Sequence, residues 1–276
     1  MLISKLHATG NDFLVTATAA DLGAEVAVGL CDRHTGVGAD GLIMMLPASN
    51  GADATMVLRN ADGGIAEMSG NGIRCLAWAA VRDGRAHGDS LVVDTGGGRR
   101  TLELVVKNDE LVYATCDMGS AVFEPAAIPL DASSALDLEA QVDGTTYRGD
   151  AVGMGNPHFV LLVNDVDDVP LHHHGRVLEH DARFPNRTNV EFVQHAGPDR
   201  VRMVVWERGV GETLSCGTGA CAAASVAHRR GLTGNRVTVD VPGGTLDVSI
   251  DSTLRLGGPV VQVFDAHLDP HDLVPR

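Results

Sequence analysis

Two short motifs combine a side chain able to exchange a proton with glycines that leave backbone N–H groups accessible. They are Ser69-Gly70-Asn71-Gly72 and Cys216-Gly217-Thr218-Gly219, and an apolar helical pattern follows each. A helix N-terminus carries about half a positive charge and unpaired N–H groups, so each motif predicts an anion site. We expect the two motifs to grip one carboxylate group together.

Cys216 is the most reactive candidate of the 5 cysteines. A thiol directly before a helix has its pKa lowered from about 8.5 to between about 3.5 and 7.5. We therefore predict a catalytic Cys216, against the alternative of a small buried hydrophobic residue. The other cysteines form no CxxC pair, so we expect no disulfide framework, no structural zinc site and no metal: they are Cys31, Cys75, Cys116 and Cys221.

In this prediction, two helix starts bind one carboxylate, and each carries an acid–base group. This arrangement suits removal of the proton from the carbon next to the carboxylate and its return from the opposite face of that carbon. Neutral hydrogen-bonding groups and one charged pair nearby fit an amino-acid ligand. In the charged pair Glu207-Arg208, the carboxylate can accept from an ammonium group and the guanidinium can donate two parallel hydrogen bonds to a carboxylate. The residues concerned are Asn11, Asn60, Asn156, Asn189, Glu207 and Arg208.

The two motifs belong to an internal repeat. They are displaced by 147 residues (216 − 69), and at the same displacement Val57 matches Val204 and Gly64 matches Gly211. Upstream, Gly10-Asn11 has a looser counterpart in Gly155-Asn156. The repeat predicts two halves with one fold.

Short β-rich runs fill most of the chain, and three segments have helical patterns. These are Leu22–Arg33, Gly70–Asp83 and Gly217–Arg230. This order predicts an α+β protein of two pseudo-symmetric domains, each a mostly antiparallel sheet wrapped around a central helix. We place the first half at residues 1–120, completed by 263–276, and the second at 121–262.

Composition excludes several classes. The chain has 276 residues, a formal net charge of −15 and 33 glycines, which disfavours disorder, collagen and binding to nucleic acid. No stretch approaches the apolar length of a membrane span, and the first residues lack the apolar run of a signal peptide. We expect a soluble cytoplasmic protein.

Ordered blocks along the chain resemble the diaminopimelate epimerase family. They include Lys5–Phe13, Asp32–Gly41, Asn60–Gly63, Ser69–Cys75, Gly155–His158, Glu207–Thr213 and Ser215–Gly219. The resemblance implies a homodimeric, cofactor-independent epimerase of lysine and peptidoglycan synthesis. Its small-molecule substrate would be 2,6-diaminopimelate, interconverted between the LL and meso forms.

The resemblance also assigns roles to residues. The backbone N–H groups of Gly70-Asn71 and Gly217-Thr218 would bind the reacting carboxylate. The four asparagines, Glu207 and Arg208 would hold the substrate, mainly at its distal, non-reacting centre. His158 either orders the site or is a hydrogen-bonded, partly buried histidine.

Two positions depart from the family pattern. Ser69 stands where the family has its second catalytic cysteine, and Gly41 stands where it often has glutamine. Ser69 could be a Cys→Ser substitution, a natural branch in which Glu67 or Asp62 helps the hydroxyl relay a proton, or a sign of one-base chemistry. Related racemase-like families with one serine or threonine epimerise or dehydrate hydroxyproline. We favour the natural branch, in which no disulfide can join positions 69 and 216.

Two other classes of function remain open. One is a non-catalytic amino-acid-binding protein on the same fold. The other is a metal enzyme, suggested by His172-His173-His174 with His180 nearby. Because three adjacent histidines cannot point one way on a strand or helix, we expect a solvated turn there.

Overall fold

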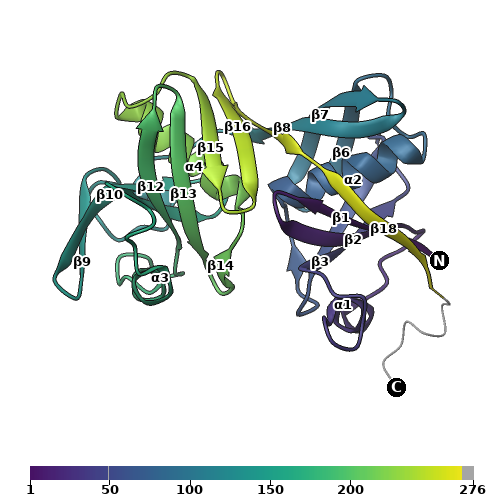
Figure 1. Ribbon diagram of the computed structural model, residues 1–276, viewed down its shortest axis with the longest axis horizontal. Helices are drawn as coiled ribbons and strands as arrows, with labels where there is room; N and C mark the ends of the chain where they lie inside the picture. Colours follow the sequence, from purple (N-terminus) through teal and green to yellow (C-terminus); the bar gives the residue numbers. More distant parts are fainter. Residues whose placement is uncertain (49, 269–276) are drawn as a thin grey trace. The chain divides into compact units, whose positions relative to one another are not determined.

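The computed structural model describes residues 1–48 and 50–268, which form two compact units (Figure 1). Unit 1 is Met1–Asp117 with the segment that begins at Gly257, and unit 2 is Met118–Leu256. The boundaries expected from the sequence were after residues 120 and 262. Residues 269–276 of the expected closing segment lie outside the described residues.

Unit 1 places α2 at the centre of its strands, where it contacts β1, β2, β3 and β4. Strands β2 and β3 are parallel, as are β4 and β6. The pairs β1–β2, β1–β18, β3–β4, β4–β5, β6–β7 and β7–β8 are antiparallel. Its strands are β1 (Leu2–Ala8), β2 (Asn11–Ala17), β3 (Gly41–Leu46), β4 (Ala54–Asn60), β5 (Ile65–Ala66), β6 (Ser90–Thr95), β7 (Gly98–Lys107) and β18 (Val261–His267), while β8 (Glu110–Gly119) and β17 (Leu254–Pro259) each span a boundary between the units along the chain. Its helices are α1 (Ala24–Cys31) and α2 (Gly70–Arg82).

Unit 2 is arranged in the same way around α4, which contacts strands on several sides (Figure 1). Its parallel pairs are β11–β12 and β13–β15. The strands are β9 (Leu138–Val142), β10 (Thr145–Gly153), β11 (Pro157–Val163), β12 (Asn189–Gly197), β13 (Arg200–Glu207), β14 (Gly211–Thr213), β15 (Arg236–Val241) and β16 (Gly244–Ile250). The helices are the short η1 (Pro125–Ala127), α3 (Leu171–Glu179) and α4 (Gly217–Arg229).

The strand register repeats at the displacement found in the sequence. Leu58 of β4 pairs with Ala66 of β5, and Val205 of β13 pairs with Thr213 of β14, 147 residues further along (205 − 58 and 213 − 66). Each short hairpin leads directly into the central helix of its unit. The predicted α+β fold of mostly antiparallel sheet around a central helix is therefore confirmed.

Both central helices are buried on nearly all sides, as their sequences indicated. Small side chains such as Ala222, Ala223 and Ala224 are fully buried and let strands approach α4 closely. Their ends agree with the sequence prediction to within one residue. The first predicted helix is shorter, because α1 covers only Ala24–Cys31.

The prediction of a solvated turn at the three histidines was wrong. His172, His173 and His174 lie on α3, which Pro170 precedes at its N-terminus. His174 is buried and hydrogen-bonds through Nδ1 to the Tyr147 hydroxyl at 2.6 Å, while its two neighbours are exposed. Tertiary packing of one face thus stabilises a helix that the polar run did not indicate.

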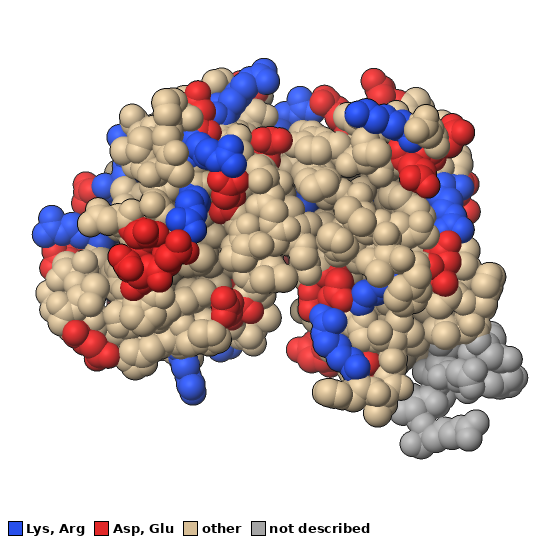
Figure 2. Space-filling view, in the orientation of Figure 1, with Lys and Arg blue, Asp and Glu red and all other residues tan. Residues whose placement is uncertain are grey.

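The visible surface mixes charges of both signs. On the face drawn in Figure 2, basic and acidic side chains lie among one another and form no single basic area. Within the described residues, no helix has the length and apolar character needed to cross a membrane.

Candidate active site

Ser69 and Cys216 occupy equivalent positions at the starts of the two central helices. Each is the residue before the first helical residue, with extended backbone (φ −141° and −121°). Ser69 Oγ accepts a hydrogen bond from the N–H of Gly72 at 3.0 Å, and Cys216 Sγ accepts one from Gly219 at 3.4 Å. The two units thus present a hydroxyl and a thiol with the same local geometry.

The Cys216 thiol is buried and close to negative charge. Burial raises its pKa well above the usual value, and the carboxylates of Glu207 and Glu191 raise it further. Hydrogen bonds with Thr218 Oγ1 (3.5 Å) and the Gly219 N–H only partly oppose this increase. The predicted lowering of the pKa by the helix terminus was therefore wrong, because desolvation and two carboxylates outweigh it.

Glu207 ends β13 directly beside this thiol. Burial raises the pKa of its carboxyl group, while hydrogen bonds from Thr213 and Cys216 act in the opposite direction. Thr213 Oγ1 donates to Glu207 Oε1 from the neighbouring strand β14. The thiol and the carboxyl group lie close enough to interact, so they titrate as a coupled pair.

Glu191, His158 and Asn156 form a chain of side-chain contacts. Glu191 Oε1 lies 2.6 Å from His158 Nδ1, and His158 Nε2 lies 2.9 Å from Asn156 Oδ1. The side chains of Glu191 and His158 are both 0% exposed. The sequence left two roles possible for His158, either ordering the site or being a hydrogen-bonded, partly buried histidine. In the structure its ring contacts both Asn156 and Glu191. Glu191 was missed, although a lone acidic residue in the apolar run of β12 was a usable signal.

Asn189 and Arg208 are joined through the backbone. Asn189 Nδ2 donates to the Pro157 carbonyl at 2.8 Å, and its Oδ1 accepts from the Arg208 N–H at 3.0 Å. The Asn189 amide therefore holds the Arg208 backbone in position directly after the end of β13. The same turn is held by buried Glu179 of α3, which accepts from the Gly209 N–H at 2.9 Å and which the sequence did not indicate.

The Ser69 end of α2 is joined to Asn11 through Asn71. Asn71 Nδ2 donates to Asn11 Oδ1 at 3.4 Å. Its own Oδ1 accepts from the fully buried guanidinium of Arg74 at 2.8 Å and from Thr9 Oγ1 at 3.4 Å. Unit 1 therefore has a buried cation one turn into its central helix, whereas the residue 147 positions further along, in α4 of unit 2, is Cys221.

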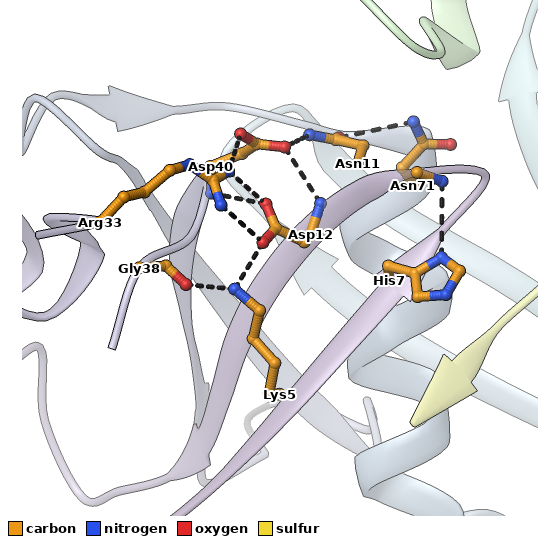
Figure 3. A network of polar contacts seen from close by, with 9 residues as sticks. Lys5, His7, Asn11, Asp12, Arg33, Gly38, Asp40 and Asn71 are labelled. Carbon is orange, nitrogen blue, oxygen red and sulfur yellow. Dashed lines mark hydrogen bonds and ion pairs between the residues drawn. The ribbon is translucent and has the colours of Figure 1, made fainter. Parts of the chain in front are cut away.

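Asn11 also belongs to a network of charged residues (Figure 3). Asn11 Nδ2 donates to Asp40 Oδ2 at 2.6 Å, and Arg33 bridges Asp40 and Asp12. Lys5 pairs with Asp12 from the other side. Burial opposes ionisation of Asp12, but hydrogen bonds from Arg33 and Lys5 outweigh it and hold its pKa well below the usual range.

Asn60, at the end of β4, is exposed and begins a tight turn in which the Gly63 N–H donates to its carbonyl at 2.9 Å. It pairs across the strands with Gly41, where an added Cβ would lie 2.8 Å from the Arg59 carbonyl oxygen. The strand backbone thus leaves no room for a side chain where the family often has glutamine. Asp62, one suggested helper of Ser69, accepts from the Gly64 N–H in its own turn.

Three residues of unit 2 could hold a metal ion by their types and distances. One ligand atom from each of Asp143, His173 and His174 lies within 4.8 Å of the others. Two of these groups already hydrogen-bond to each other, since His173 Nε2 lies 2.6 Å from Asp143 Oδ2. They include none of the residues that surround Cys216.

Comparison with known proteins gives a family. The profile of diaminopimelate epimerase matches residues 3–124 and 150–260. A diaminopimelate epimerase of Pelotomaculum thermopropionicum is 42% identical over 273 residues, covering 96% of this chain and 97% of the relative. The enzyme of that name from Methanococcus maripaludis is 36% identical over 277 residues, covering 98% of this chain and 100% of the relative.

Solved structures support the fold alone. A hydroxyproline epimerase from Agrobacterium vitis with bound trans-4-hydroxy-L-proline has a TM-score of 0.74 at 16% identity, covering 99% of this chain and 94% of that chain. A predicted epimerase from Pseudomonas aeruginosa has a TM-score of 0.71 at 18% identity, covering 97% and 98%. Taken with the profile match and the full-length relatives, these observations show that the chain belongs to the diaminopimelate epimerase family.

Proposed function

We propose that this protein interconverts LL- and meso-2,6-diaminopimelate. The reaction removes the proton from one α-carbon and returns a proton to the other face of that carbon, without a cofactor. The observation that carries the proposal is the pair of equivalent helix starts, one with Ser69 and one with Cys216. Relatives with that name and 36–42% identity over almost the whole chain support the substrate.

Cys216 and Ser69 are the proposed acid–base groups. The backbone N–H groups of Gly70, Asn71, Gly217 and Thr218 bind the reacting carboxylate, since helix N-termini stabilise anions. The remaining substrate groups are assigned to Asn11, Asn60, Asn156, Glu207 and Arg208, with Asn189 holding the Arg208 backbone.

The two groups differ strongly as acids. Burial and two nearby carboxylates favour the thiol form of Cys216, which can donate a proton. To remove a proton from the substrate, Cys216 must first lose its own proton to solvent and act as a thiolate. Ser69 is a hydroxyl, which is a much weaker acid than a thiol and a poor base when its proton is retained. We therefore expect different initial rates from the two substrate isomers.

The wider setting is part of the same proposal. We infer a role in lysine and peptidoglycan precursor synthesis in the cytoplasm, as a homodimer that takes a small amino-acid substrate and neither nucleic acid nor membrane.

Solvent exchange tests the activity directly. In heavy water, the purified protein should incorporate deuterium at the α-position of LL-diaminopimelate, measured by mass spectrometry. Incorporation no faster than with Cys216→Ala would refute the proposal. Trans-4-hydroxy-L-proline is the comparison substrate, and exchange confined to it would identify the serine–cysteine alternative instead.

A further inference from the structure

A second carboxylate, in addition to that of Glu207, lies beside the start of α4. Glu191 is in β12, flanked by the buried apolar residues Val190 and Phe192, and its side chain is 0% exposed. Charged residues are almost never fully buried unless they are paired. Its burial therefore requires an explanation from its surroundings.

The contacts place this carboxylate against the helix start that carries Cys216. A Cβ added to Gly219 would lie 2.7 Å from Glu191 Oε1 and 3.3 Å from Cys216 Sγ. On its other side, the same oxygen lies 2.6 Å from His158 Nδ1. Glu191 thus lies between the turn around the thiol and the imidazole ring.

One oxygen of this group is not satisfied. Within the part of the chain that the structure describes, Glu191 Oε2 is buried and has no hydrogen-bond partner. An unpartnered buried polar atom opposes folding, so a protein that retains one generally gains something else from it.

We propose that Glu191 is a positioning residue of the Cys216 site, which orients Asn156 through His158 and keeps a second negative charge beside Cys216. Only the identity of the substrate in this proposal rests on the function proposed above.

The imidazole ring transmits the orientation. One ring nitrogen lies 2.6 Å from Glu191 Oε1 and the other 2.9 Å from Asn156 Oδ1, so the ring connects the two side chains. A carboxylate at Nδ1 fixes the plane of such a ring. The ring in turn holds the amide of Asn156, which we assign to substrate binding.

The charge acts on the thiol. The carboxylates that act on Cys216 are Glu191 from β12 and Glu207 from β13, and His158 from β11 contacts Glu191. Glu191 raises the pKa of Cys216, in addition to the larger effects of burial and Glu207. Removal of this one charge should therefore favour the thiolate.

The first test follows the thiolate without substrate. Thiolate ultraviolet absorbance is recorded against pH for the unchanged protein and for Glu191→Gln, each corrected by the same chain with Cys216→Ser. The midpoint of the Cys216 titration should move to lower pH by about one unit. Glu212→Gln, which removes a partly exposed carboxylate from β14, is the matched control and should leave it unchanged. An unchanged midpoint in Glu191→Gln would overturn the electrostatic part.

The second test separates position from charge. Glu191→Asp keeps the charge but is one methylene shorter, so the titration midpoint should return toward that of the unchanged protein. The KM for diaminopimelate should remain about fivefold raised, the effect of loosening one hydrogen bond. An unchanged KM in Glu191→Asp and Glu191→Gln would overturn the positioning part. If the unchanged protein exchanges no substrate, the proposed function fails, while the thiol titration still decides the role of Glu191.

Discussion

The starts of α2 and α4 have the same backbone geometry and opposite electrostatic surroundings. An added Cβ on Gly72 would meet a methyl group of Ile43 at 3.2 Å, whereas on Gly219 it would meet a carboxylate oxygen of Glu191 at 2.7 Å. At the first helix start, the fully buried cation Arg74 donates to the Gly70 carbonyl at 2.9 Å.

The register shows that these differences are substitutions at equivalent places. Phe13 pairs with Gly41 as His158 pairs with Asn189, so two residues further along Ile43 corresponds to Glu191. The repeat preserved the helix start and its capping bond in both halves. In the second half, the carboxylates of Glu191 and Glu207 lie beside the capping thiol.

The capping bond at a helix start and the acid–base environment of the capping side chain are therefore separable features. A helix N-terminus needs only backbone geometry and a capping oxygen or sulfur. Tuning a proton donor requires side chains from neighbouring strands, and those can change without altering the cap.

The largest expected effect separates the two capping residues. Cys216→Ala should lower α-proton exchange by about 10²–10⁴-fold, the usual contribution of a positioned acid–base group. Ser69→Ala should lower it much less, because the hydroxyl is the weaker partner. Deuterium incorporation into diaminopimelate measures both, and equal losses would show that the two ends contribute alike.

The second prediction makes the two ends chemically alike. Ser69→Cys should raise the exchange rate by up to about 100-fold, because a thiol exchanges protons far more readily than a hydroxyl. It should also reduce the difference between initial rates from LL and meso substrate. Ser90→Cys, on β6 of the same unit, is the control for an added thiol. A rate below that of the unchanged protein would contradict the assignment of Ser69.

The third prediction concerns the network beneath Asn11. Asp12→Asn should destabilise the protein by about 3 kcal/mol, because it leaves Lys5 and Arg33 without their shared partner. The folded pKa of Asp12 is lowered, so its contribution is present above its unfolded pKa and is lost as the pH falls through the folded value. The stability difference measured by urea unfolding should therefore shrink in acid.

Asp62→Asn, in an exposed turn of the same unit, is the control for this network. It should change stability by no more than about 0.5 kcal/mol. An equal effect of the two substitutions would show that the network contributes little beyond a surface charge.

The smallest effect compares the two capping bonds. Ser69→Ala should cost about 1 kcal/mol of stability, since it removes the oxygen that accepts from the Gly72 N–H at 3.0 Å. Cys216→Ala should cost less through this bond, because sulfur is a weaker acceptor and the contact is 3.4 Å. Thermal unfolding of both variants measures the difference, and the reverse order would show that the sulfur cap is the stronger one.

Much of the fold could be predicted because repeated local patterns specify it. The glycine motifs and the alanine-rich segments after them located α2 and α4 to within a residue, and the repeat predicted two halves with one fold. The helix α3 could not be found in this way. Its three histidines carry no apolar period, and it is packing of Leu171, His174 and Leu178 that stabilises it.

In the candidate site, too, some features depend on local sequence and others on tertiary packing. The sequence by itself determined the two helix starts, their capping side chains and the family, because these depend on residues adjacent in the chain. The tertiary structure alone decided the state of Cys216, since Glu191 and Glu207 reach it from two other strands. A thiol pKa depends on burial and nearby charge in space, and the strand register sets both.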